Sequence, residues 1–439
     1  MVNIKWSAKM VSQGDLVEIT TKRDVVLSGV LVKENQEKTI LKLESGYNIG
    51  ISKLNIRRTT LLKHGVFKKD MVLPKIENNP KLKKISILHT GGTIASRVDY
   101  ETGAVSTTFQ PEELIALFPE LKNYANISSR LVKNMWSQDM RFAHYNILAK
   151  EIKKDIDSGA DGIIISQGTD TLHYTASALS FILENIGIPV LIVGAQRSSD
   201  RPSTDARDNL INAVYFMTHS EFSDVGICMH ETSDDLFCAI SSATKTRKNH
   251  TSRRDAFRSV NCEPYARVDY RTEKIEYRNM SFNTSKEQKL KLKLFKENIR
   301  VALIKQHTNM YAEQFSFFRR FDGLVIESTG LGCLPISEKD KDTRESGKIL
   351  NAIKILIRKG VTIAEAPETI NGRIILNVYE DQRVAQEVGI IGSFSDMTPE
   401  TSFIKLAWLL SNYTKKETRE LFTKNLRGEI SETLNYHEI

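Results

Sequence analysis

The sequence predicts an α/β fold with a mostly parallel sheet, preceded by a small all-β barrel. Two observations favour this fold class. From residue 85 onward, continuous apolar runs alternate with segments whose apolar residues recur at helical spacing. Before them, over residues 14–56, short stretches alternate apolar with polar residues and are rich in Val, Ile, Leu and Thr. The length of 439 residues allows two or three domains.

The first expected domain is a barrel over residues 1–70. Its strand-like runs are GDLVEITT, VVLSGVLVK, TILKLES and NIGISKLNI, and Gly, Asp, Asn and Ser separate them. Residues 71–84 contain two prolines, an Asn-Asn pair and several lysines, without apolar periodicity. We therefore expect a linker there.

The rest of the chain is expected to form two α/β domains, over residues 85–290 and 291–439. A continuous apolar run predicts a strand whose sheet is covered by helices on both faces. Runs of this kind occupy residues 85–89, 162–166, 190–194, 226–229, 301–305 and 323–328.

Helical spacing recurs between these strands. In the segment 203–217, Ser203 is the expected N-cap. In the later helix MTPETSFIKLAWLL, Thr398 fits the N-cap and Pro399 the first helical position. The charged stretch 414–439 is expected to be a surface helix or a tail.

The composition is that of an ordinary soluble protein, with 40% hydrophobic and 26% charged residues. The net charge of +8 does not by itself indicate nucleic-acid binding, because binding requires a concentrated patch. No apolar run is long enough to cross a bilayer, and the start MVNIKWSAKM lacks a signal-peptide core. The cysteines are scattered without a C-x-x-C pair, which favours a reducing cytoplasm and no metal site: Cys228, Cys238, Cys262 and Cys333.

Polar residues follow three of the predicted strands, at the carboxyl ends where open α/β sheets bind ligands. They are Thr90 to Thr93, Gln167 to Thr171, and Ala195 to Ser198. Neither G-x-x-x-x-G-K-[ST] nor G-x-G-x-x-G is present, so a phosphate-binding loop is not expected.

A threonine hydroxyl at this edge, such as Thr93, is weakly nucleophilic unless a base removes its proton. His89 lies within a strand and is expected to be a core residue. A lysine held near the carboxylate of Asp170 is the better base, and Lys245 and Lys248 are the available lysines. Taken alone, each polar residue also has a plainer use as a helix cap or turn residue.

Five motifs together resemble the bacterial-type, or class I, L-asparaginase/glutaminase family over roughly residues 85–412. One GGT would be a weak signal, but five motifs in the family's order are a strong one. They are TGGTIAS (90–96), SQDM (137–140), QGTDTL (167–172), GAQRSSDRPSTDARDNL (194–210) and K-x-H-T-x-x-x-D-A-F (248–257).

The resemblance implies catalytic roles. Thr93 would be the acyl-forming nucleophile, and Thr169 with Asp170 would be the second threonine and its carboxylate. Lys248 would complete this relay, with Lys245 as the alternative. The implied substrate-binding residues are Tyr100 on a mobile lid and Ser137 and Gln138 at the substrate's α-carboxylate.

The implied reaction is amide hydrolysis. The neutral lysine would deprotonate a threonine, which attacks the side-chain amide carbon and expels ammonia, and water would then cleave the ester. Backbone N–H groups near Gly92 would stabilise the oxyanion, and closure of loop 94–106 would exclude water.

The amino-terminal runs GDLVEI, SGVLV and ILKLESGYNIGI resemble the small barrel in the glutaminase subunits of archaeal tRNA-dependent amidotransferases. That family implies a heterodimer with an E subunit, paired further through an asparaginase-like homodimer. This chain would hydrolyse glutamine or asparagine without a cofactor. The partner would bind Glu-tRNA(Gln), use ATP and Mg, and receive the ammonia.

Two alternatives stay open, namely a free-standing cytosolic L-asparaginase and a non-catalytic RNA- or protein-binding scaffold. Residues 365–369 depart from the Thr/Ser-Gln stretch common in the family, and Cys333 replaces a polar residue. These departures leave the preference between glutamine and asparagine open.

Overall fold

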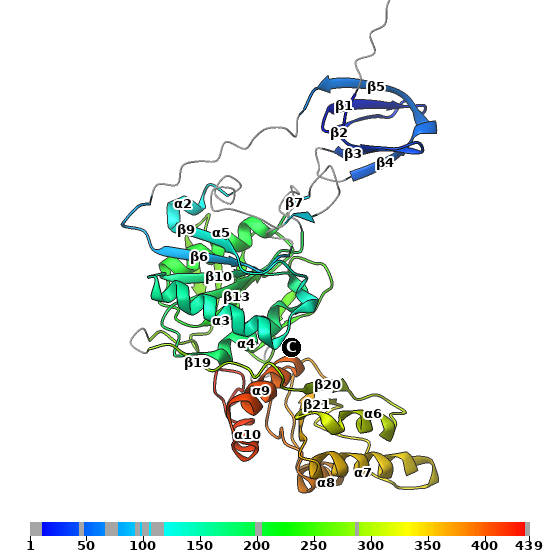
Figure 1. Cartoon of the computed structure of the whole chain (residues 1–439), viewed down its shortest axis with the longest axis vertical. Helices are drawn as coiled ribbons and strands as arrows, with labels where there is room; N and C mark the ends of the chain where they lie inside the picture. The colour runs from blue at the N-terminus through cyan, green and yellow to red at the C-terminus, as the bar shows by residue number, and fades with distance from the viewer. Residues whose placement is uncertain are drawn as a thin grey trace, which may run out of the picture.

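The computed structural model describes residues 11–43, 48–65, 78–92, 97–98, 105–106, 118–197, 204–285 and 289–434. Figure 1 shows three parts in chain order: a small sheet, a large α/β domain, and a smaller α/β domain at the other end. The fold class predicted from the sequence is confirmed. Within the described residues, no helix is both long and apolar enough to span a membrane.

The small domain is a five-stranded antiparallel sheet in the order β4-β3-β2-β1-β5. Alternate residues point inward, so that Val17, Ile19 and Leu41 form a core shielded from solvent. Its strands are β1 (Leu16–Thr21), β2 (Val26–Glu34), β3 (Lys38–Leu43), β4 (Asn48–Ser52) and β5 (Ile56–Lys63), with the 3₁₀ turn η1 (Lys53–Asn55) before β5.

The large domain contains an eight-stranded sheet in the order β18-β17-β14-β13-β12-β10-β6-β9. From β9 to β13 the pairs are parallel, whereas β13, β14, β17 and β18 pair antiparallel. The sheet is therefore mixed, with the predicted parallel strands at its centre. Its strands are β6 (Lys84–His89), β9 (Asn126–Leu131), β10 (Gly162–Ser166), β12 (Val190–Val193), β13 (Val225–His230), β14 (Cys238–Ser242), β17 (Ala266–Asp269) and β18 (Lys274–Tyr277).

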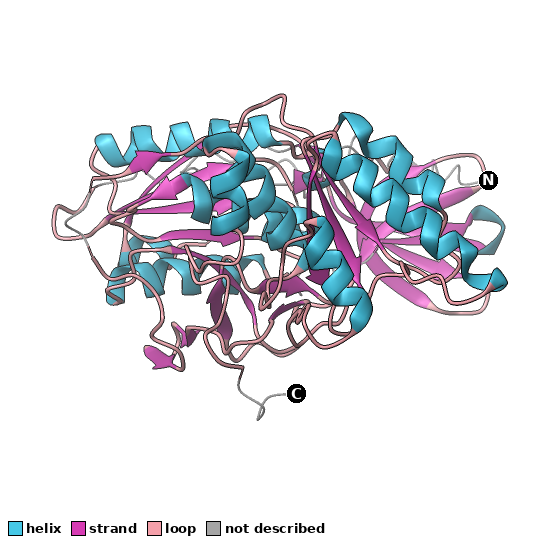
Figure 2. Ribbon diagram, turned by 90° about the horizontal axis from the view of Figure 1, so that it is seen from below, coloured by secondary structure: helices cyan, strands magenta, loops and turns pink. Residues whose placement is uncertain are grey.

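Helices cover both faces of this sheet, which explains its continuous apolar strands (Figure 2). One buried cluster includes residues of α3 and α4, and the other includes residues of α2 and α5. The helices are α2 (Leu121–Tyr124), α3 (Phe142–Asp157), α4 (Leu172–Ile182) and α5 (Ala206–His219).

The predicted start of α5 was wrong. Asp205, not Ser203, occupies the N-cap position, and Ser203 lies outside the described residues. The carboxylate of Asp205 accepts hydrogen bonds from the preceding loop and makes none to its own helix's first-turn N–H groups. The side chain at the N-cap position thus binds the preceding loop and not the helix. The helical spacing of apolar residues carries no information about this contact.

The smaller domain is built on three parallel strands, β20 (Val301–Lys305), β21 (Gly323–Ser328) and β22 (Thr362–Pro367). Thr398 caps α9 as predicted, because its hydroxyl accepts from Thr401 N at 3.2 Å, and Pro399 is the first helical residue. The helices are α6 (Ala312–Ser316), α7 (Arg344–Arg358), α8 (Glu380–Val388), α9 (Pro399–Asn412) and α10 (Lys415–Leu421), with 3₁₀ turns η5 (Phe317–Arg320) and η6 (Lys341–Thr343).

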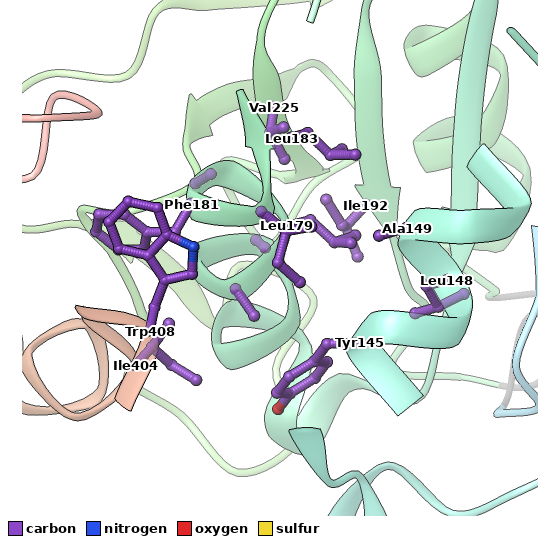
Figure 3. Close-up of a cluster of buried hydrophobic side chains, with 14 of the residues drawn as sticks. Tyr145, Leu148, Ala149, Leu179, Phe181, Leu183, Ile192, Val225, Ile404 and Trp408 are labelled. Atoms are coloured by element: carbon purple, nitrogen blue, oxygen red, sulfur yellow. The ribbon is translucent and has the colours of Figure 1, made fainter. Parts of the chain in front are cut away.

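Helix α9 joins the two α/β domains. It packs on all three strands of its own sheet and on α4 of the large domain. The ring centroids of Trp408 on α9 and Phe181 on α4 lie 5.3 Å apart (Figure 3). The two domains therefore share one hydrophobic core across this helix pair.

Within the described residues after 414, which end at residue 434, the expectation of a surface helix or tail holds only for α10. Beyond it the chain turns back into the protein, with Phe422 and Glu429 fully buried. The carboxylate of Glu429 pairs with the Lys405 ammonium at 2.5 Å, and both side chains are buried. The charged composition of residues 414–439 predicted an exposed segment, but the Glu429 carboxylate is buried in an ion pair with Lys405.

Two-residue and three-residue strands complete the structure. They are β7 (Arg97–Val98), β8 (Val105–Ser106), β11 (Leu183–Glu184), β15 (Thr246–Lys248), β16 (Phe257–Ser259) and β19 (Lys291–Leu292).

Candidate active site

The site begins where the backbones that follow β6 and β10 meet. Gly92 has φ +86°, and a Cβ at this position would overlap the backbone nitrogen of Gly168. Only glycine combines this conformation with such a close approach. The Thr90 N–H also donates to Ser166 O at 3.0 Å. The two strand ends are thus held against each other.

Directly after Gly168, the 3₁₀ turn η4 (Thr169–Thr171) presents Thr169 and Asp170. The ammonium of Lys248, at the end of β15, donates to Thr169 Oγ1 at 2.9 Å and to Asp170 Oδ1 at 2.8 Å. The lysine side chain is 10% exposed, whereas that of Asp170 is 66% exposed. A mostly buried ammonium therefore meets an alcohol and a carboxylate that faces outward.

The other lysine considered from the sequence makes different contacts. Lys245 Nζ donates to Asp396 Oδ2 at 2.5 Å and to Ser431 Oγ at 2.8 Å. Its side chain is 4% exposed, and that of Asp396 is fully buried. Lys245 lies in the bend before β15, whereas Lys248 is the last residue of that strand, so the two lysines separate into a buried ion pair and a site residue.

The hydroxyl of Thr169 has a second partner that the sequence analysis did not assign. It donates to Gln196 Oε1 at 3.3 Å while it accepts from Lys248. A hydroxyl offers one proton and two lone pairs, so both contacts can exist together. Gln196 lies three residues after the end of β12, among the polar residues that follow the predicted strands. This position was the sequence signal that could have indicated its role.

A further unassigned residue, Asp205, supports this loop. Its carboxylate accepts from Gln196 N at 3.0 Å and from Arg197 N at 3.0 Å, and also from Asn209 Nδ2 at 3.2 Å. Asp205 is fully buried. The motif S-T-D-A-R-D-N-L contains both Asp205 and Asn209, but spacing alone does not show which loop they hold.

The expected substrate residues Ser137 and Gln138 lie on the 3₁₀ turn η3 (Ser137–Asp139). Ser137 is buried beside Gly168, and its carbonyl oxygen accepts from Thr171 Oγ1 at 2.6 Å. Gln138 is exposed on the same turn. This turn therefore adjoins the turn that carries Thr169.

Two residues of the expected site, Thr93 and Tyr100, lie outside the described residues. The described chain reaches Gly92, the neighbour of Thr93, at the junction of the two strand ends. The loop 94–106 is described only at residues 97–98 and 105–106, which pair as β7 and β8.

His89 lies in the core as expected. It is 2% exposed, and its Nε2 is 2.7 Å from Ser129 Oγ. Burial lowers its pKa to about 4, so the ring is neutral at neutral pH.

One acidic cluster could suggest a metal site elsewhere in the large domain. Ligand atoms of Asp208, His230 and Asp235 lie within 4.8 Å of one another. Arginines already pair with these carboxylates, namely Arg254 with Asp235 and Arg207 with Asp208. The guanidinium groups supply the positive charge, so we assign no metal to this cluster.

Comparison with known proteins identifies both α/β domains. Residues 84–282 match the model of the asparaginase N-terminal domain, and residues 300–422 match the glutaminase/asparaginase C-terminal domain. The L-asparaginase of Thermococcus kodakarensis has a similar structure, with a TM-score of 0.69 and 27% identity, covering 80% of this chain and 100% of that one. L-asparaginase I of Vibrio cholerae gives a TM-score of 0.67 and 25% identity, covering 80% and 99%.

The fold and the site thus define a protein of the asparaginase/glutaminase class. The small domain narrows this class, because residues 11–62 match the GatD N-terminal domain. The D subunit of glutamyl-tRNA(Gln) amidotransferase from Methanococcus maripaludis strain C7 is 40% identical over 427 residues, covering 96% of this chain and 99% of the relative. The D subunit from Pyrococcus abyssi is 39% identical over 432 residues, covering 96% and 95%. The chain belongs to the family of glutamyl-tRNA(Gln) amidotransferase D subunits.

Proposed function

We propose that this chain hydrolyses the side-chain amide of glutamine, or of asparagine, and supplies the ammonia to a partner E subunit. The partner converts Glu-tRNA(Gln) to Gln-tRNA(Gln) with ATP and Mg. The similarity to D subunits over 96% of the chain supports this division of labour. The GatD N-terminal match favours it over a free-standing asparaginase.

The observation that carries the proposal is the contact of Lys248 with Thr169 and Asp170. In the proposed reaction, the hydroxyl proton of Thr93 passes through Thr169 to Lys248 as Thr93 attacks the amide carbon, and Lys248 passes a proton on to the leaving nitrogen. The C–N bond breaks, nitrogen leaves with the transferred proton as ammonia, and an ester to Thr93 remains. Water then cleaves the ester and restores the hydroxyl.

The surroundings of the relay support this chemistry. Backbone N–H groups at Gly92 and beside Thr169 are suited to stabilise the oxyanion. Asp170, largely exposed, is free on its outer side to meet the substrate's α-amino group. We assign Ser137 and Gln138 to the α-carboxylate and Tyr100 to a lid that excludes water.

The test separates amide hydrolysis from ammonia transfer. Thr93→Ala, assayed in the complex with the partner, should lose glutamine-dependent transamidation and keep ammonia-dependent transamidation. Loss of both activities together would make Thr93 structural and contradict the proposal. Thr90→Val is a matched control, because Thr90 Oγ1 donates to Ser166 O within the fold.

A second candidate, a free-standing asparaginase, is favoured by the similarity to solved L-asparaginases. Ammonia release from glutamine and from asparagine, with and without the partner and charged tRNA, distinguishes the two. A lone homo-oligomer with high asparaginase turnover would favour the free enzyme.

A further inference from the structure

Lys248 stands on a short strand outside the large sheet. Among the described strands, β15 pairs only with β16. A two-stranded ribbon is marginally stable without support. The position of the Lys248 ammonium relative to Thr169 therefore depends on what holds β15 in place.

The smaller domain supplies this support through the start of α9. Thr401 Oγ1 donates to the carbonyl oxygen of Thr244 at 2.8 Å, just before β15. On β15 itself, Arg247 Nε lies 3.0 Å from Glu400 Oε1. Arg247 is the immediate neighbour of Lys248, so this ion pair fixes the strand one residue from the ammonium.

Glu400 also lies close to α4, the helix that follows the turn bearing Thr169 and Asp170. Its Oε1 lies 3.9 Å from Nε2 of His173. His173 is the second residue of α4, which directly continues the turn that bears Thr169 and Asp170. One carboxylate thus lies against both the strand of the lysine and the helix behind the threonine.

The electrostatics of this contact are simple. Burial lowers the pKa of His173 to about 4, so its ring is neutral at neutral pH and Arg247 is the cation that faces Glu400. Glu400 lies in the first turn of α9, where the helix dipole stabilises a carboxylate. Its side chain is 10% exposed, which limits screening by solvent.

We propose that Glu400, a residue of the smaller domain, is a positioning residue for amide hydrolysis. It holds Arg247 beside α4 and thereby sets the distance of the Lys248 ammonium from Thr169. The inference rests on the proposed relay of Lys248, Thr169 and Asp170, and it adds to this relay a residue from outside the large domain. Glu400 contacts Arg247 and His173 and acts on the reaction through Lys248, so substrate affinity should be nearly independent of it.

The experiment compares Glu400→Ala, Glu400→Gln and Glu184→Gln in the full chain, with ammonia release at saturating and limiting amide. Glu184 is the matched control, because it also joins the domains, through Arg427 at 3.4 Å, but at the far end of α4. Glu400→Ala should lower kcat about tenfold or more, since small misplacements of reacting groups are costly, with KM within about twofold. Glu400→Gln, which can still accept from Arg247, should keep more activity, and Glu184→Gln should keep normal kcat.

A kcat for Glu400→Ala equal to that of Glu184→Gln would overturn the proposal. If Glu400→Ala does not fold, Arg247→Lys replaces it, because lysine keeps the charge but not the planar donor geometry. A normal kcat in Arg247→Lys would then overturn it. Lys248→Ala is measured in the same assays. If Lys248→Ala stays active, the proposed relay is refuted. If Lys248→Ala is inactive but Glu400→Ala has a normal kcat, only the positioning role of Glu400 is refuted.

Discussion

The carboxylate of Asp205 accepts the backbone N–H of Gln196 through both oxygens, each at 3.0 Å. This contact orients a loop whose amide side chain reaches Thr169. Asp205→Ala should leave two backbone donors unsatisfied and lower the free energy of unfolding by about 2–4 kcal/mol. It should also lower kcat, because Thr169 loses its fixed acceptor.

Denaturant unfolding and ammonia release measure both effects. Thr204→Val is the control, because Thr204 Oγ1 holds the same loop at the Arg197 carbonyl oxygen at 2.9 Å. It removes two neutral hydrogen bonds, the second accepted from Ala206 N at 3.1 Å, and should cost about 1–2 kcal/mol, with normal kcat. Equal kinetics for the two variants would show that Asp205 does not orient the site.

The two lysines of the Lys245–Lys248 segment should respond in opposite ways. Lys245→Met leaves the buried Asp396 carboxylate without its cation and should lower the free energy of unfolding by about 3–5 kcal/mol. Lys248→Met should change stability far less, because Asp170 is largely exposed, but should lower kcat by about 10² or more. Urea titration with rate assays distinguishes the variants, and an active Lys248→Met would contradict the relay.

Gly92→Ala tests the junction of the two strand ends. It combines positive-φ strain with overlap of Gly168, so it should lose most activity and about 2–4 kcal/mol of stability. Gly159→Ala is matched in conformation, with φ +85°, but its Cβ would meet open space. It should cost only about 1 kcal/mol. If the two variants were equally stable and active, the close approach would have no role.

The buried carboxyl group of Glu365 should make the stability of the protein depend on pH. Burial raises its pKa from 4.5 to about 8, and this effect outweighs the opposing influence of the Ser328 hydroxyl. The folded state therefore holds a proton that the unfolded state releases, so this group lowers stability as pH rises from about 5 to 8, by about 1.4 kcal/mol per pH unit.

Glu365→Gln should remove this penalty. The variant should gain stability over the natural protein as pH rises from 5 to 8, and differ little near pH 4. Thermal unfolding at these pH values measures the difference. Glu380→Gln, at a carboxylate 82% exposed, should show no such trend. A gain from Glu365→Gln that did not change with pH would contradict the ionisation argument.

Much of the fold could be predicted because it depends on local patterns. Continuous apolar runs marked the buried strands, such as β10 and β21, and alternation marked the small sheet. The cap of α9 followed from Thr398 and Pro399, since capping involves residues next to each other in the chain. The start of α5 failed because Asp205 serves a loop instead.

The sequence by itself determined the order of the domains, the types of side chain at the strand ends and the resemblance that names their roles. Only the tertiary structure decided that Lys248 and not Lys245 meets Thr169, that Asp205 holds the Gln196 loop, and that Glu400 lies against both β15 and α4. The physical reason is that strand periodicity and capping act over a few residues, whereas these contacts join residues up to 227 positions apart, from His173 to Glu400. Such distances close only when helices and sheets pack.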